Sequence, residues 1–279
     1  MKNLIVRSLS GIVYVALLVA AALVGGGWLA ALMCIFCVLG IFELTKMQVE
    51  KIARGAFLFD IGAGISLILS SFFLFSGRFD FASNSIACFL AFIIVRMISQ
   101  LYSVRVNPVH ALASSLMSQI YIALPLALVF PLYYSLATPH LLLAMLIFIW
   151  VNDTGAFCAG SLLGKHKLFQ RISPNKTWEG FFGGLIFCIA AAWVMAGCFP
   201  SFFSPLTDEV DMSLMGMVCL GAAVSVAATF GDLLESLIKR TTGVKDSGNL
   251  IPGHGGILDR IDSLLLVVPA SVIFFMLIN

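Results

Sequence analysis

Charged side chains gather in one 31-residue stretch of the sequence, which begins at Asp232 and ends at Asp262. The stretch holds nine of the 30 charged residues (16 basic plus 14 acidic) of the 279-residue chain. Asp232, Glu235, Ser236, Lys239 and Arg240 recur at helical spacing (i, i+3, i+4, i+7 and i+8), which predicts that they share one face of a helix. Asp259 and Asp262 repeat the three-residue spacing at the start of the last apolar segment. Two carboxylate pairs with basic residues between them suit a hard cation together with phosphate oxygens.

The segment between the two acidic pairs is rich in glycine. Residues 252–256 read Pro-Gly-His-Gly-Gly, which cannot form regular helix and lets the backbone come close to a ligand. An alternative is that the stretch is only a basic cytoplasmic loop between membrane helices. That alternative explains the lysines and arginines, but it does not explain four acids at or inside the ends of apolar segments. A binding or catalytic site is therefore the favoured interpretation.

A second polar cluster lies at residues 152–180. Asp153 follows an apolar run, where an ionised carboxylate is costly unless it has a partner. Ser173, Lys176 and Thr177 lead into the next apolar run. They offer hydroxyl groups, an ammonium group and helix N-terminal N–H groups, all of which suit a phosphate. The cluster therefore predicts a phosphate-binding segment.

The composition is that of a membrane protein. Hydrophobic residues make up 61% of the chain and charged residues 11%, whereas a soluble domain has about 25% charged residues. Continuous apolar segments predict an all-α, polytopic transmembrane helical bundle with about nine spans. The spans lie at roughly 9–24, 28–45, 56–76, 84–101, 111–135, 139–158, 180–199, 213–238 and 257–278.

The chain is predicted to form a single integral-membrane domain over residues 1–279. Within it, residues 1–135 are less specific helices, and residues 139–279 carry the catalytic site. The fifth span contains Pro125 and Pro131, which predict a kink. The first apolar segment is expected to be retained as a helix rather than removed as a signal peptide.

Basic residues predict the orientation. With a cytoplasmic N-terminus, 15 of the 16 basic residues lie on the cytoplasmic side, and Arg78 is the exception. This is the positive-inside pattern, and it places both polar clusters on the cytoplasmic side. Two further acids lie in the N-terminal half. Asp60 is either a functional carboxylate or a buried hydrogen-bonded residue, and Glu43 is expected at the membrane interface.

The residue types favour phosphoryl or nucleotidyl transfer over hydrolysis. No serine or cysteine stands in a hydrolase-type context. A lipid phosphate would supply its own nucleophilic oxygen, because the second pKa of a phosphomonoester is about 6. Catalysis would then consist of positioning, bridging by a metal ion and charge neutralisation.

At this point the motifs resemble a known family. Residues 236–262 contain, in order, Ser236, Lys239, Arg240, Lys245, Asp246, Gly248, His254, Gly255, Gly256, Asp259, Arg260 and Asp262. This pattern is similar, without a gap, to that of the phosphatidate cytidylyltransferases (CDP-diacylglycerol synthases). Residues 153–156, 164–167 and 173–180 also resemble that family, whereas Phe157 stands where a tyrosine is common. The N-terminal half matches only in length and hydropathy.

The resemblance implies transfer of CMP from CTP to phosphatidate, which gives CDP-diacylglycerol and pyrophosphate for phospholipid biosynthesis. It also implies Mg²⁺, with room for a second cation, and a homodimer in the lipid bilayer. The location is the bacterial cytoplasmic (inner) membrane, with the active site on the cytoplasmic side. No nucleic-acid partner is expected.

Site residues are carried over by position. The metal ligands are expected to be Asp232 and Asp259, with Asp262 assisting. The other catalytic residues are expected to be Lys239, Arg240 and His254, with His254 a donor to the leaving group. The substrate-binding residues are expected to be Asp153, Lys165, Ser173, Lys176, Thr177, Lys245, Asp246, Gly255, Gly256 and Arg260.

The sequence leaves two other functions open. One is a related CTP-dependent transferase or a kinase that acts on another lipid or prenyl phosphate. The other is a transporter or channel that uses Asp60, Asp153 and Asp232 as an ion path. A transporter requires ionisable residues along the membrane depth, whereas here they gather at one face.

Overall fold

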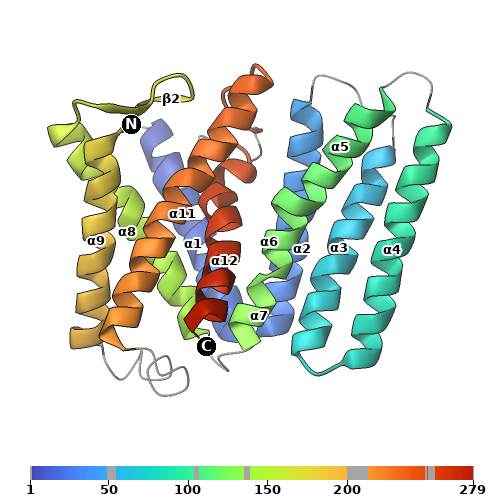
Figure 1. Cartoon of the computed structure of the whole chain (residues 1–279), viewed down its shortest axis with the longest axis horizontal. Helices are drawn as coiled ribbons and strands as arrows, with labels where there is room; N and C mark the ends of the chain where they lie inside the picture. Colours follow the sequence, from blue (N-terminus) through green and yellow to red (C-terminus); the bar gives the residue numbers. More distant parts are fainter. Residues whose placement is uncertain are drawn as a thin grey trace. The chain divides into compact units, whose positions relative to one another are not determined.

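The computed structural model describes residues 2–48, 55–103, 107–134, 139–199, 213–248, 250 and 255–278. The described chain is almost entirely helical (Figure 1). It folds into two compact units. Unit 1 comprises Met1–Pro131 and Thr241–Ile261, and unit 2 comprises Leu132–Arg240 and Asp262–Asn279.

Unit 1 contains the N-terminal helices and the loop that precedes the last helix. Its helices are α1 (Lys2–Val24), α2 (Gly26–Met47), α3 (Ala56–Phe75), α4 (Phe79–Leu101), α5 (Pro108–Ser118), the π-helix η1 (Gln119–Ala123) and α6 (Leu124–Ala127). Helix α7 (Val129–Tyr134) continues from unit 1 into unit 2. The fifth predicted span is divided into successive short helices, and Pro125 and Pro131 lie in the two that follow η1. The predicted kink stays a prediction.

Unit 2 contains the helices and the hairpin that carry most of the predicted site. Its elements are α8 (His140–Leu163), β1 (Lys167–Phe169), β2 (Ser173–Thr177), α9 (Trp178–Cys198) and most of α11 (Leu214–Thr241) and α12 (Leu258–Ile278). The β1–β2 hairpin was not expected from the sequence.

The helices identify a multi-pass membrane protein. Among the described residues, eight helical segments are long and apolar enough to cross a bilayer, and α1 adds a shorter apolar stretch, Gly11–Val24. The predicted all-α, polytopic fold is therefore confirmed. The total of about nine spans and the cytoplasmic N-terminus stay predictions.

A buried ion pair joins three helices of unit 1. Arg96 on α4 is 1% exposed, and its Nε lies 3.4 Å from a carboxylate oxygen of Asp60 on α3. The guanidinium also donates to Gln100 at 3.2 Å and to the carbonyl of Ala111 on α5 at 3.1 Å. Ser115 donates a further hydrogen bond to Asp60. Of the two expectations for Asp60, the buried hydrogen-bonded residue is the one observed.

Candidate active site

Three acids of unit 2 converge on one point. Asp232 and Glu235 lie nearly one turn apart on α11, and Asp262 lies near the start of α12. One carboxylate oxygen from each lies within 4.8 Å of the other two, and no other such group of three occurs in the described part of the chain. The side chain of Glu235 is 1% exposed, whereas that of Asp232 is 39% exposed. We call these three residues the acidic cluster.

A lysine from another element contacts the acidic cluster. Lys176 Nζ lies 2.6 Å from Asp232 Oδ2 and donates to the carbonyl oxygen of Thr229 at 3.3 Å. The other carboxylate oxygen of Asp232 accepts from Ser236 Oγ at 3.3 Å. Lys176 therefore sits where it neutralises the most exposed acid of the cluster.

The two basic residues of α11, Lys239 and Arg240, make contacts on different sides of the helix. Lys239 is buried and its Nζ lies 2.5 Å from Glu235 Oε2, one turn earlier. Arg240 is exposed and its Nε donates to the carbonyl of Ile172 at 3.4 Å. The predicted helix face is thus seen for Lys239, while Arg240 instead contacts the loop between β1 and β2.

A glycine allows α11 and α12 to approach closely. A Cβ atom at Gly231 would lie 2.8 Å from the carbonyl oxygen of Asp262 and 3.1 Å from Cα of Ser263. The hydroxyl of Ser263 donates to the carbonyl of Ala228 at 3.3 Å, which ties the two helices together. This contact sets the separation of the backbones that carry Asp262 and the α11 acids.

A two-stranded hairpin between α8 and α9 carries the lysine of the site (Figure 1). Strands β1 and β2 pair antiparallel. Thr177 ends β2 and caps α9, because its hydroxyl accepts from the N–H of Gly180 at 3.1 Å. Before β1, His166 Nδ1 lies 2.6 Å from Glu179 Oε1. Both contacts anchor the hairpin to the first turn of α9.

A polar pocket of about 320 Å³ opens beside Asp232 and Lys176. Its other lining residues are Asn152, Asp153, Ala156, Phe157, Gly160, Leu168, Asn175, Thr177, Gly180, Phe181 and Thr229. Asn152 is held by Ser225 Oγ, which donates to its Oδ1 at 2.7 Å. Asp153, beside it, is exposed. The pocket therefore brings Asp153, Lys176, Thr177 and Asp232 together, four of the residues predicted from the sequence.

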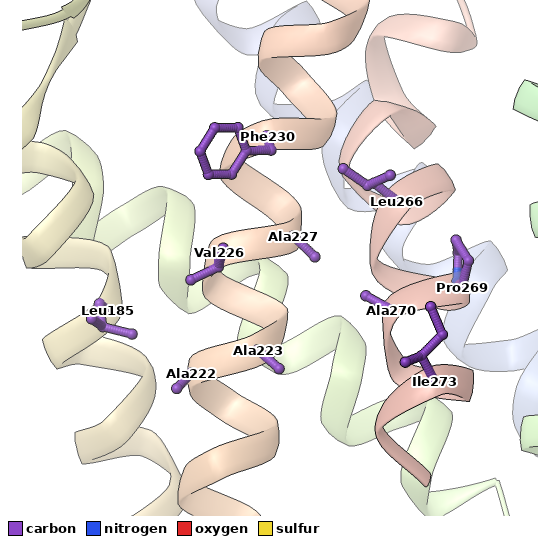
Figure 2. A pocket seen from close by; sticks show the side chains of 10 residues that line it. All are labelled: Leu185, Ala222, Ala223, Val226, Ala227, Phe230, Leu266, Pro269, Ala270 and Ile273. Carbon is purple, nitrogen blue, oxygen red and sulfur yellow. The ribbon is translucent and has the colours of Figure 1, made fainter. Parts of the chain in front are cut away.

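An apolar groove of about 760 Å³ lies on the same helices (Figure 2). Its lining residues are Leu185, Ala222, Ala223, Val226, Ala227, Phe230, Leu266, Pro269, Ala270 and Ile273. Four of them are alanines, whose small side chains leave the hollow between α11 and α12. Phe230 is the lining residue of the groove that is closest in sequence to Asp232. Its ring packs edge-on against Phe181 of the polar pocket.

The acidic cluster has the chemistry of a site for a hard divalent cation. Its donors are carboxylate oxygens, which Mg²⁺ prefers, and the described cluster offers no thiolate or imidazole. Asp232 is exposed on the side of the polar pocket, so a bound ligand could share the ion. The residues therefore fit a metal ion of this class.

Comparison with known proteins decides the family. The model of the cytidylyltransferase family matches residues 5–278. This chain belongs to the cytidylyltransferase family. A phosphatidate cytidylyltransferase from Staphylococcus haemolyticus is 33% identical over 267 residues, 95% of this chain and 96% of that protein. The resemblance seen in the motifs is thereby confirmed.

Other relatives match over a shorter region at higher identity. A phosphatidate cytidylyltransferase from Haemophilus influenzae is 44% identical over 135 residues, which are 48% of this chain and 45% of that protein. One from Staphylococcus aureus strain COL is 46% identical over 134 residues, 47% of this chain and 46% of that protein. Each of these two matches thus spans about half the length of the relative.

Asp259 belongs to a separate hydrogen-bond network, in unit 1. Its Oδ2 atom accepts from Ser247 N at 2.9 Å, from Ser247 Oγ at 2.8 Å and from Gly256 N at 2.8 Å. These bonds hold the carboxylate in one orientation. The predicted metal pair of Asp232 and Asp259 stays a prediction.

The remaining predicted residues lie in or just before the hairpin, in the loop before α12 and in the first turn of α12. Lys165, Lys245 and Asp246 are exposed, and Ser173 and Arg260 are half-buried. Gly256 is buried, and Gly255 has a φ of 80°, in the left-handed region that favours glycine. His254 lies outside the described residues.

Two further acids have contacts that the sequence did not predict. Glu43 is buried, 4% exposed, and bonded to the start of α12, while its expected place at the membrane interface stays a prediction. Glu235 shares the acidic cluster, as its spacing from Asp232 on one helix face indicates, although it was not among the site residues carried over by resemblance.

Proposed function

We propose that this protein transfers CMP from CTP to phosphatidate, which gives CDP-diacylglycerol and pyrophosphate. A phosphate oxygen of the lipid forms a bond to the α-phosphorus of CTP. The bond from that phosphorus to the bridging oxygen of the β-phosphate breaks, and pyrophosphate leaves with the electron pair. The observation that carries the proposal is the acidic cluster with Lys176 at its edge, inside a cytidylyltransferase.

The acidic cluster would hold the Mg²⁺ ion through Asp232, Glu235 and Asp262. A bound ion there would neutralise phosphate charge and polarise the phosphorus–oxygen bonds. Asp259 would also be a metal ligand, as its sequence motif indicates. The same motif leaves room for a second cation.

Basic residues would do the work of binding phosphates. Lys176 pairs with Asp232, and in a complex with substrate its ammonium group would turn to a phosphate oxygen. Thr177 and Ser173 would add hydrogen bonds from the same strand. The basic residues near the end of α11, in the loop that follows it and in the first turn of α12 would bind the rest of the triphosphate and the lipid head group. They are Lys239, Arg240, Lys245 and Arg260.

Further predicted roles belong to the same proposal. His254 would donate a hydrogen bond to the leaving pyrophosphate, and Gly255 and Gly256 would let the backbone approach it. The other predicted substrate contacts are Asp153, Lys165 and Asp246. Of these, Asp153 lines the polar pocket.

The lipid nature of the acceptor is supported by the succession of surfaces along α11. Thr229 and Asp232 line the polar pocket, while Val226, Ala227 and Phe230 line the apolar groove. A phosphate head group in the first would leave an acyl chain at the mouth of the second. An apolar surface next to a phosphate site suits a lipid phosphate and would be unfavourable for a soluble acceptor.

The cellular setting is also part of the proposal. The charge pattern favours a cytoplasmic active site, where CTP is available, and the bacterial relatives favour the cytoplasmic membrane. We further propose a homodimer, as the family resemblance implies.

A direct assay tests the function. The purified protein in lipid–detergent micelles, with Mg²⁺, phosphatidate and CTP labelled at its α-phosphate, should form a labelled lipid and release one pyrophosphate per lipid. Labelled lipid with another lipid phosphate, and none with phosphatidate, would assign the protein to a related transferase instead. Substrate movement across liposomes without any labelled lipid would contradict the enzymatic proposal.

Replacing Gly231 by alanine should lower activity by about tenfold, because the new Cβ would push α12 away from α11. Displacements well below 1 Å suffice, since a 1 Å misplacement in an active site costs about 10²-fold. The measurement is kcat at saturating CTP, phosphatidate and Mg²⁺. Gly197→Ala on α9 is the matched control, because nothing lies within 4 Å of a Cβ there. Equal activity of the two variants would show that the contact between the helices is not needed.

A further inference from the structure

A buried glutamate of α2 holds the start of α12. The N–H groups of Ile257 and Leu258 donate to the two oxygens of Glu43, each at 2.9 Å. The first N–H groups of a helix have no partner within the helix and form its positive end. A carboxylate 214 and 215 residues away in the chain supplies the missing acceptors. Bonds of this kind, from N–H groups to a charged acceptor, are among the stronger hydrogen bonds in proteins.

The same carboxylate is linked to Asp259 through one serine. Ser247 Oγ lies 3.0 Å from Glu43 Oε2 and 2.8 Å from Asp259 Oδ2. A hydroxyl group carries one proton, so at any moment it can donate to only one of two carboxylates. The orientations of the two acids are therefore coupled through Ser247.

Gly256, just before α12, packs tightly against Glu43. A Cβ atom at Gly256 would lie 2.3 Å from Glu43 Oε2 and 2.2 Å from Ser247 Oγ, so only glycine fits there. Gly256 in turn donates its N–H to Asp259 at 2.8 Å. Ser247 and Gly256, which both pack against Glu43, thus both donate to Asp259, the carboxylate that the sequence motif assigns to the metal.

We propose that Glu43 is a positioning residue for cytidylyl transfer: it holds Ser247 and the first turn of α12 so that Asp259 keeps one orientation. This rests on the proposed function and on the predicted role of Asp259. Glu43 touches neither substrate nor metal in this account. It acts because its two oxygens fix the backbone and the hydroxyl that surround Asp259.

The test compares Glu43→Gln with wild type in the full-length protein. Glutamine has the same size, but its amide offers one acceptor oxygen where glutamate offers two. We expect the Mg²⁺ concentration for half-maximal activity to rise by about 10- to 100-fold, the usual cost of losing a residue that orients a metal ligand. A purely structural role would lower the amount of folded enzyme without moving this concentration. Asp80→Asn, an exposed acid of α4 in the same unit, should leave it unchanged.

A second measurement is independent of activity. Hydrogen exchange of the peptide that contains Ile257 and Leu258 should be about tenfold faster in Glu43→Gln, because those amides lose a charged acceptor. If wild type has no transferase activity but this peptide still exchanges faster in Glu43→Gln than in wild type, the proposed function is refuted. The contact between Glu43 and the start of α12 is then still supported. Unchanged exchange together with an unchanged Mg²⁺ requirement would overturn the role of Glu43.

Ser247→Ala keeps the test decisive if Glu43→Gln fails to fold. It removes only the hydroxyl that joins the two acids, while the N–H of residue 247 still reaches Asp259. The Mg²⁺ requirement should shift in the same direction by a smaller factor. In the double variant the shifts should be less than additive, since both changes break one linked set of bonds. An unchanged requirement in folded Ser247→Ala protein would contradict the coupling of the two acids.

Discussion

Asp232→Asn is expected to lower kcat by about 10³-fold while the protein stays folded. Asparagine matches aspartate in size but removes the charge that pairs with Lys176 at 2.6 Å and that completes the acidic cluster. A 10³-fold loss corresponds to about 4 kcal/mol of transition-state stabilisation, which is the scale of one lost contact to a catalytic metal ion. The measurement is the rate of labelled CDP-lipid formation at saturating substrates and Mg²⁺, per folded protein.

Two comparisons separate a metal-binding role from loss of charge in general. Asp80→Asn removes an equivalent charge at an exposed position of α4 and should keep wild-type kcat. Asp232→Asn, Glu235→Gln and Asp262→Asn should each weaken binding of Mn²⁺, measured by electron paramagnetic resonance in the absence of substrates. If Asp232→Asn retained kcat within twofold of wild type, the acidic cluster would not be the catalytic metal site.

Periodicity in the sequence was sufficient to predict the helices and, except for Arg240, the face of α11. Apolar segments of about 20 residues are typical of membrane helices. The charged residues between these segments mark the two polar clusters. The i, i+3 and i+4 spacing follows from helix geometry alone. The structure accordingly has Asp232 bonded to Ser236, and Glu235 paired with Lys239.

The contacts that could not be predicted join residues far apart in the chain. Glu43 meets Ser247 and Leu258 across more than 200 residues, and no local pattern distinguishes this glutamate from one at the membrane interface. The β1–β2 hairpin was missed for another reason. Its strands are three and five residues long, and β2 reads Ser-Pro-Asn-Lys-Thr, without the alternation of apolar and polar residues that predicts a strand. The hairpin is stabilised by its contacts with α9 and by its own pairing.

Lys176→Gln is expected to reduce kcat/KM for CTP by about 10²-fold. The ammonium group is the basic group closest to Asp232 in the polar pocket, and it is only 25% exposed. Loss of one preoriented donor to a phosphate in such a site costs about 10²- to 10³-fold. The matched control is Lys167→Gln, which removes the same charge from an exposed position on the same hairpin. Equal effects of the two substitutions would mean that the hairpin attracts CTP only by its overall charge.

The pairing of Lys176 with Asp232 also predicts how the two losses combine. If the lysine only neutralised the aspartate, the double variant Asp232→Asn/Lys176→Gln would regain activity over Asp232→Asn alone, because it no longer leaves an unpaired ammonium group in the pocket. If the lysine binds a phosphate in the transition state, the double variant would be no better than the worse single variant. We expect the second result, because Lys176 Nζ already has another acceptor in the carbonyl of Thr229 and does not depend on Asp232 to stay in the pocket. Measuring kcat/KM for the three variants and wild type decides between the two roles.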